Sequence, residues 1–166
     1  MLCHDGEIEA VCQVERLHQP VRGGPSTHRR TVDVDPDLMA HAQRLMQEIG
    51  WTGVAQIEFL VNETESYLTE VNGRFWGSLP TNLRAGMDFP GLLFDMMVDG
   101  TVPDGRPSYR TGVYCRNLFL DVDWFLENLT HPHDREFLLT KPWKAVMAEL
   151  WDALPADEHW DSFTRD

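Results

Sequence analysis

The sequence predicts an α+β domain, in which an antiparallel β-sheet is flanked by α-helices. Segments in which apolar and polar residues alternate, as in half-buried strands, are interleaved with segments whose apolar residues recur every three or four positions, as in amphipathic helices. Two strand-like segments, 53–61 and 66–72, are separated only by a short polar stretch, which indicates an antiparallel hairpin. Hydrophobic residues make up 42% of the chain, which is enough for a packed core.

The length and charge of the chain limit its organisation and its partners. For 166 residues we expect a main domain over 1–120 and a helical C-terminal extension over 121–166 that packs on it. The net charge of −13 argues against nucleic acid and anionic membranes, which both require clustered Lys and Arg. No apolar run approaches the ~20 residues that span a bilayer. Three irregularly spaced cysteines fit free thiols in a reducing cytoplasm.

The first third of the chain alternates strand, loop and helix signals. Apolar and polar residues alternate over 7–17, which predicts a half-buried strand, and the Gly- and Pro-rich segment 18–30 predicts a loop. Segment 35–50 predicts a helix, because an Asp-Pro pair begins it and Gly50 ends it.

The later elements follow from the same patterns. After the hairpin strands 53–61 and 66–72, the sequence predicts short helices at 80–86 and 89–100, a strand at 109–122, and helices at 123–129 and 141–154. The seven histidines form no recognisable constellation. Arg116 and Asp121 are interpreted as a surface ion pair, and the alternative is that they reach the functional site from a neighbouring strand.

The hairpin places two glutamates opposite each other. A five-residue loop over 62–66 gives a register in which like charges face each other, and such pairs destabilise a sheet. The predicted cross-strand pairs are Val61–Tyr67, Leu60–Leu68, Glu58–Glu70 and Gln56–Asn72.

A divalent cation between the two carboxylates would offset their repulsion. Oxygen ligands from Glu58, Glu70 and the amide of Asn72 suit a hard ion such as Mg²⁺ or Mn²⁺. Mg²⁺ usually takes one or two protein carboxylates and completes its shell with water and phosphate oxygens. Arg74, two residues beyond Asn72, would face the same phosphates. The alternative is a solvated strand face on which water and salt screen both glutamates.

The segment 50–79, "GWTGVAQIEFLVNETESYLTEVNGRFWGSL", resembles the C-terminal catalytic subdomain of the ATP-grasp superfamily. The resemblance is closest to the carboxylate–amine ligase and carbamoyl-phosphate-synthase-like branches. The family pattern is an acidic residue on one strand followed by Glu-x-Asn-x-Arg on the next, and Glu58 with Glu70, Asn72 and Arg74 matches it. The resemblance implies half of an ATP-grasp fold.

The resemblance also implies the roles of these residues. Glu58 and Glu70 would hold Mg²⁺, with Glu70 bridging two ions at the nucleotide phosphates, and Asn72 would complete the shell of the second ion. Arg74 would be the catalytic residue that stabilises the transferred phosphoryl group or an acyl-phosphate.

Further residues would contact the nucleotide. The resemblance places Leu60 against the adenine. It places the loop that contains Gly24 and Ser26 near the ribose and the substrate, although a Gly-Gly-Pro run is usually only a turn.

By resemblance, the chain is the ATP- and Mg²⁺-binding part of an ATP-dependent carboxylate–amine, or related C–N, ligase that acts through an acyl-phosphate. Transfer of the γ-phosphoryl group would activate a small carboxylate substrate for attack by an amine. In this superfamily a preceding subdomain supplies lysines to the phosphates, whereas this chain has only Lys141 and Lys144. We therefore expect a ligase only if an N-terminal half completes the fold. The expected protein partners are a second copy of the chain in a homodimer, or a partner chain that supplies the missing subdomain. The alternative is a non-catalytic half-domain or partner-binding module from a truncated or split ATP-grasp protein.

Overall fold

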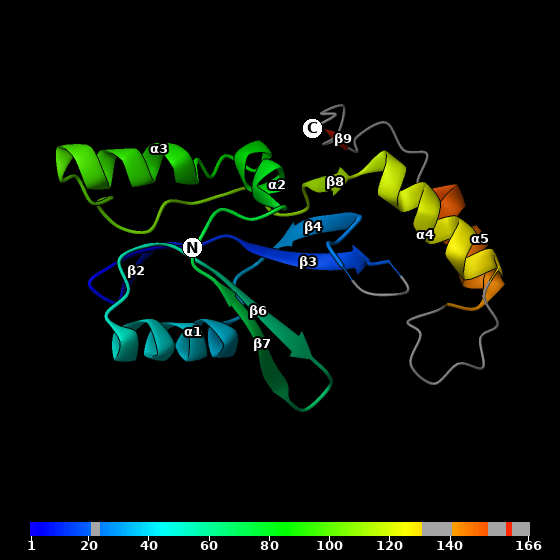
Figure 1. Ribbon diagram of the computed structural model, residues 1–166, viewed down its shortest axis with the longest axis horizontal. Helices are drawn as coiled ribbons and strands as arrows, with labels where there is room; N and C mark the ends of the chain where they lie inside the picture. Colours follow the sequence, from blue (N-terminus) through cyan, green and yellow to red (C-terminus); the bar gives the residue numbers. More distant parts are fainter. Residues whose placement is uncertain (21–23, 131–140, 153–158, 161–166) are drawn as a thin grey trace.

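The structure of the protein is a computed structural model that describes residues 1–20, 24–130, 141–152 and 159–160 (Figure 1). These residues form three small β-sheets and five α-helices, so the predicted α+β class is confirmed. The strands are β1 (Leu2–His4), β2 (Glu7–Ala10), β3 (Gln13–His18), β4 (His28–Val32), β5 (Gly53–Val54), β6 (Gln56–Val61), β7 (Ser66–Asn72), β8 (Tyr114–Arg116) and β9 (His159–Trp160). The helices are α1 (Pro36–Ile49), α2 (Leu79–Arg84), α3 (Phe89–Phe94), which continues as the π-helical turn η1 (Asp95–Asp99), α4 (Leu118–Thr130) and α5 (Trp143–Asp152).

The strands are divided among three sheets rather than joined in one. The sheet orders are β2-β1-β5, β3-β4-β8-β9 and β6-β7, and every pair is antiparallel except β8–β9. The predicted strand over 7–17 is two strands, because the chain changes sheets at residues 11–12. Ala10 pairs with Leu2 in the first sheet, whereas Gln13 pairs with Val32 in the second. Alternation of apolar and polar residues continues through the change and conceals it.

Helix α1 begins and ends where its capping residues predicted. The Asp35 carboxylate accepts hydrogen bonds from the amides of Asp37 and Leu38 at 2.9 and 3.1 Å, and these amides have no partner inside the helix. Gly50 ends the helix in the left-handed conformation, with a φ of 59°. Met46 is fully buried against the β1–β2 hairpin.

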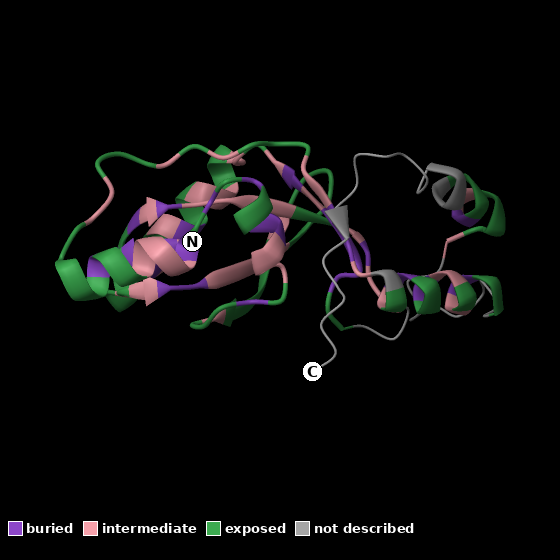
Figure 2. Ribbon diagram, turned by 90° about the horizontal axis from the view of Figure 1, so that it is seen from above, coloured by how far each residue is buried: buried purple, intermediate pink, exposed green. Residues whose placement is uncertain are grey.

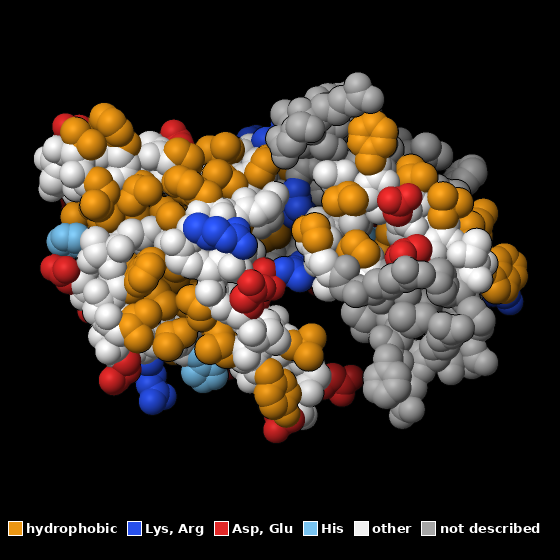
Figure 3. All heavy atoms as spheres, in the orientation of Figure 1, with side chains coloured by type: hydrophobic (Ala, Val, Ile, Leu, Met, Phe, Trp, Pro, Cys, Tyr) orange, Lys and Arg blue, Asp and Glu red, His pale blue; other side chains and the backbone are white. Residues whose placement is uncertain are grey.

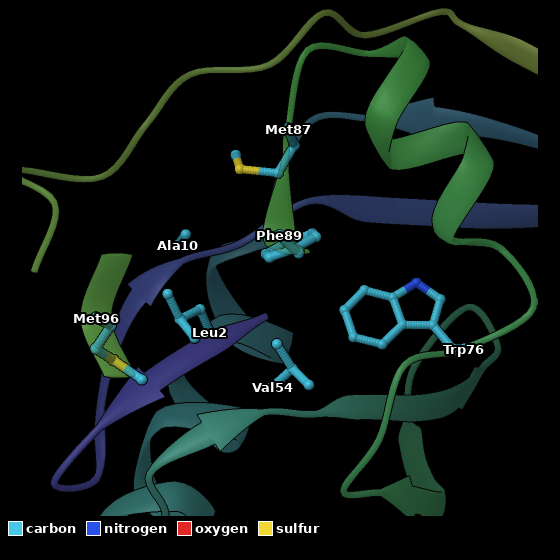
Figure 4. Close-up of a cluster of buried hydrophobic side chains, with 7 residues drawn as sticks. All are labelled: Leu2, Ala10, Val54, Trp76, Met87, Phe89 and Met96. Atoms are coloured by element: carbon cyan, nitrogen blue, oxygen red, sulfur yellow. The ribbon is translucent and has the colours of Figure 1, made fainter. Parts of the chain in front are cut away.

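The main core lies between the N-terminal strands and the segment that follows β7. Figure 4 shows Trp76, Phe89 and Leu2 pointing toward one another in this core. The Trp76 and Phe89 rings meet edge to face, with centroids 5.2 Å apart, and the Trp76 indole N–H donates to Asn82 Oδ1 at 2.8 Å. Through Trp76, the core holds in place the segment that immediately follows the β6–β7 hairpin.

The predicted strand over 109–122 is wrong over most of its length. Only β8 is extended, and α4 begins at Leu118. Asn117 supplies the helix start, because its side-chain oxygen accepts a hydrogen bond from the Leu120 amide at 3.2 Å. Helix α4 crosses residue 120, where the main domain was predicted to end.

The helices occupy both ends of the molecule (Figures 1 and 2). Helices α1 and α3 lie at one end, and α4 and α5 pack together at the other, with β3, β4 and β8 between them. None of the helices in the described ranges combines the length and the apolar character that crossing a bilayer requires.

Candidate functional site

The β6–β7 hairpin brings Glu58 opposite Glu70, as the sequence predicted. The predicted pairs Val61–Tyr67 and Leu60–Leu68 are wrong, because the loop is one residue shorter. The observed register near the turn is Val61–Ser66, Leu60–Tyr67 and Phe59–Leu68. Asn62 shortens the loop: its side-chain oxygen accepts hydrogen bonds from the Thr64 and Glu65 amides at 2.9 and 2.7 Å.

A β-bulge restores the glutamate pairing. The register shifts between Glu58 and Phe59, so that Thr69 is the extra residue on β7. Beyond the bulge Glu58 pairs with Glu70 and Gln56 with Asn72, both as predicted. The bulge compensates for the shorter loop.

The two faces of the hairpin have different environments. Ile57 and Phe59 pack against the core cluster that contains Met46 of α1. Glu58 and Leu60 alternate with them, so they belong to the opposite face. The core therefore fixes which face of the strand carries the carboxylates.

The Glu58 carboxylate is paired with the Arg16 guanidinium of β3. The side chain of Glu58 is 18% exposed and that of Arg16 is 37% exposed, whereas Glu70 is an exposed residue. Sequence reasoning missed Arg16, which lies 42 positions before Glu58. Figure 3 shows acidic and basic side chains close together near the middle of the side of the molecule that it presents.

Asn72 and Arg74 continue from the glutamate pair toward the core. Asn72 is half-buried, and its amide donates to the side-chain oxygen of Gln56 at 3.4 Å. Arg74 is exposed and donates to the Phe75 carbonyl at 3.0 Å. Asn72 thus pairs with Gln56 on the rung that the sequence predicted, and Arg74 follows two residues later, beyond the end of β7.

Gly73, between Asn72 and Arg74, lies so close to the Trp51 ring that a side chain has no room there. A Cβ atom at this position would lie 2.7 Å from the indole of Trp51. A side chain at position 73 would displace that ring, so the chain leaves the hairpin through a glycine.

Leu60 is on the carboxylate face and 65% exposed. The shorter loop places Tyr67 opposite it, and this side chain is 52% exposed. The predicted register had paired Tyr67 with Val61 instead. An apolar and an aromatic side chain thus lie side by side toward the free end of the hairpin, where Figure 3 shows hydrophobic groups on the surface.

Gly24 and Ser26 lie in the segment before β4. Gly24 has a φ of 127°, which favours glycine. Ser26 is buried, and its hydroxyl donates to the His28 carbonyl at 3.1 Å. Within the described residues, neither Gly24 nor Ser26 makes a hydrogen bond to the hairpin.

A second ionic cluster is buried where β3, β4 and β8 meet α4. Asp121 Oδ1 lies 2.6 Å from His18 Nδ1 and accepts a hydrogen bond from the Thr27 hydroxyl at 2.9 Å. The other carboxylate oxygen is paired with Arg116. The predicted surface ion pair between Arg116 and Asp121 is therefore wrong in its location, because both residues are only 2% exposed.

The electrostatics of this buried cluster are set by its partners. Burial raises the pKa of Asp121, but hydrogen bonding and charge attraction from His18 and Arg116 outweigh burial and lower it below the ordinary value. The His18 ring stacks on Trp124 of α4, with centroids 3.8 Å apart. The cluster thus fastens α4 to the sheet.

The donor set on the hairpin fits a hard divalent cation. Among the described residues, no three His, Cys, Asp or Glu side chains gather as a metal site. The hairpin instead offers two carboxylates and an amide, which matches the small number of protein ligands that Mg²⁺ takes beside phosphate oxygens. In chemical type, these three donors therefore fit Mg²⁺.

The fold and the paired glutamates define the class of protein as ATP-grasp. The α+β arrangement and the cross-strand glutamates followed by Asn-x-Arg agree with the resemblance that the sequence showed. The family model described as "ATP-grasp in the biosynthetic pathway with Ter operon" matches residues 1–118, and the chain belongs to this family. The chain is therefore related to ATP-dependent enzymes of the ligase type.

A curated relative agrees with the family match. The chain is 32% identical over 107 residues to an acetyl-CoA carboxylase of Dictyostelium discoideum. The match covers 61% of this chain and 5% of the carboxylase. The chain thus spans a small part of that relative, and the similarity concerns a segment of it.

Proposed function

We propose that this chain provides the ATP- and Mg²⁺-binding part of an ATP-dependent carboxylate–amine, or related C–N, ligase that acts through an acyl-phosphate. The observation that carries the proposal is the direct pairing of Glu58 with Glu70 on the hairpin face turned away from the core, in a chain of the ATP-grasp family. A sheet gains nothing from two opposed carboxylates, whereas a cation held between them makes the arrangement favourable.

The chain's own residues have separate tasks in this proposal. Glu58 and Glu70 hold the cation, and the Asn72 amide oxygen adds a neutral ligand. Arg74 binds phosphate oxygens and stabilises negative charge on the phosphoryl group as it moves. Leu60, with Tyr67 beside it, offers an apolar surface to the adenine ring. Mg²⁺ supplies charge neutralisation on the phosphates when it is bound.

The lysines do not contribute to this hairpin. Lys141 Nζ lies over the Trp124 ring at 5.7 Å, and Lys144 Nζ lies over the Trp143 ring at 5.8 Å. Both contacts are at the α4–α5 end of the molecule, away from the hairpin (Figure 1). We therefore propose that a complete ligase obtains its phosphate-binding lysines from a preceding subdomain or from a partner chain.

Calorimetric titration of the purified chain with ADP, with and without Mg²⁺, tests the proposal. We expect binding that requires Mg²⁺ and that is lost in Glu70→Ala, because one carboxylate cannot replace the pair. Glu63→Ala is the matched control, since Glu63 is an exposed glutamate at the tip of the same hairpin. Equal ADP binding by wild type and Glu70→Ala would refute the assigned site. No ADP binding by the wild-type chain would refute independent nucleotide binding.

A non-catalytic partner-binding module is the second candidate. The observation that favours it is the exposure of a regularly spaced apolar stripe on one side of α4: Phe119, Val122, Leu126 and Leu129. Light scattering after gel filtration would measure self-association, which we expect to disappear in Leu126→Glu. A module of this kind would associate whether or not Mg²⁺ and ADP are present.

A further inference from the structure

Glu58 is paired with Arg16, and this arginine is not part of the Glu/Glu-x-Asn-x-Arg pattern on the hairpin. Arg16 comes from a different sheet, and its guanidinium reaches the carboxylate face of the hairpin. Both side chains retain contact with solvent, at 37% exposed for Arg16 and 18% for Glu58. Exposed ion pairs are weak, because water competes for each charge. This pair can therefore exchange its partners at little cost.

Arg16 itself lies in an unfavourable place. It pairs across the β3–β4 ladder with Arg29, so two guanidinium-bearing residues are directly opposite each other. Burial and, to a smaller extent, the charge of Arg16 lower the pKa of Arg29. Two neighbouring sheets thus each contain a like-charge pair, Arg16–Arg29 and Glu58–Glu70, and the contact between Arg16 and Glu58 joins them.

We propose that Arg16 binds the phosphates of the nucleotide, and that it is paired with Glu58 until a divalent cation binds to this carboxylate. This inference rests on the proposed nucleotide and metal site. A cation on Glu58 and Glu70 replaces Arg16 as the partner of Glu58. Arg16 is then left beside Arg29 and close to the cation, so binding of another anion there becomes favourable. A phosphate group held by the same cation supplies that anion.

The exchange couples the binding of metal and nucleotide. Metal alone must displace Arg16 and leaves its charge uncompensated, which weakens metal binding. Metal together with ADP satisfies both the glutamates and Arg16. Each ligand therefore strengthens the binding of the other, as thermodynamic linkage requires.

Manganese binding to the full chain, measured by electron paramagnetic resonance, separates this role from a structural one. In Arg16→Gln we expect Mn²⁺ alone to bind about threefold to tenfold more tightly, because a competing positive charge is gone. We expect Mn²⁺ with ADP to bind about tenfold more weakly in the same variant, because a charge-assisted phosphate contact is lost. A merely structural role for Arg16 would weaken both.

Two further variants serve as controls. Arg30→Gln removes an arginine of similar exposure from β4, where it is paired with Glu15 rather than with Glu58. It should leave both affinities close to those of wild type. Arg16→Lys keeps the charge and should retain the weak binding of Mn²⁺ alone. Circular dichroism confirms that each variant is folded.

The outcomes distinguish this inference from the proposed function. The exchange of Arg16 between Glu58 and phosphate is supported if Arg16→Gln binds Mn²⁺ alone more tightly and Mn²⁺ with ADP more weakly than wild type does. If Arg16→Gln behaves like Arg30→Gln while Glu70→Gln abolishes Mn²⁺ binding, the metal site stands and the role of Arg16 is overturned. If wild type and Glu70→Gln bind Mn²⁺ equally, or neither binds it, the proposed function fails and the exchange fails with it.

Discussion

Two ionic clusters share strand β3 and differ in their exposure to water. Arg16 belongs to the exposed cluster with Glu58 and Glu70, whereas His18, two residues later, belongs to the buried cluster with Asp121. A register shift between Arg16 and His18 separates the two environments. The comparison teaches that one strand can present one polar side chain to water and, two residues later, bury another among fixed partners.

The buried cluster is fixed because every exchange would cost desolvation. Both oxygens of Asp121 are engaged, by His18 and Thr27 on one side and Arg116 on the other. Removing one partner weakens the compensation of a charge that stays buried, which costs more than the same change in water. In the exposed cluster water replaces a lost partner, so the same change has little effect on folding.

Loss of the Asp121 carboxylate should have the largest effect. We expect Asp121→Ala to lower the free energy of unfolding by about 3–5 kcal/mol, because it removes the carboxylate that balances the buried Arg116 guanidinium in this cluster. Urea denaturation measures this change. Asp123→Ala is the control, since Asp123 is exposed on the same helix. Equal losses in the two variants would contradict the distinction between buried and exposed charge.

Acid should weaken the same cluster more gradually. The folded pKa of Asp121 is lowered, so the stability that it contributes is present above its unfolded pKa of about 3.9 and is lost as the pH falls through the lower folded value. We expect wild type to lose more stability below about pH 4 than Asp121→Asn does. Denaturation curves at successive pH values check this, and parallel curves for the two proteins would refute it.

A smaller effect is expected from the neutral partner of Asp121. Thr27→Val removes one hydrogen bond to the carboxylate and keeps the shape of a fully buried side chain. His18 and Arg116 remain in place, so we expect a loss of about 1 kcal/mol in the free energy of unfolding. Thermal unfolding measures it, and a loss as large as that of Asp121→Ala would mean that the hydroxyl organises the cluster.

The exposed cluster should give the smallest effect on folding. We expect Glu58→Gln to change the free energy of unfolding by less than about 1 kcal/mol, because its ion pair with Arg16 is accessible to water. The same variant should lose Mg²⁺-dependent ADP binding. Denaturation and calorimetry on one preparation compare the two quantities. A large destabilisation would show that this cluster stabilises the fold, as the buried cluster does.

Local pattern predicted those features that depend on neighbouring residues. The start and end of α1 follow from a capping carboxylate and a left-handed glycine, both within one turn of the helix. The opposition of Glu58 and Glu70 was predicted from a five-residue loop, and it is observed because the bulge at Thr69 compensates for a loop that is one residue shorter. The assigned roles of Leu60, Arg74 and the other site residues are still predictions.

Long-range contacts were not predictable in the same way. Arg16 and Glu58 are 42 residues apart, and His18 and Asp121 are 103 residues apart. Periodicity within a segment carries no information about which segment lies beside it. The start of α4 was wrongly predicted for another reason. Asn117 is a local capping residue, but it lies in a run of residues that also suits a strand.

The bulge at Thr69 has a consequence for how the hairpin can vary. The four-residue loop alone would shift the strands by one position, and the extra residue on β7 returns Glu58 and Glu70 to the same rung. Loop length and carboxylate alignment are therefore separate properties of this hairpin. A lineage can shorten or lengthen the turn by one residue and keep its paired acids, provided that the bulge disappears or forms in compensation.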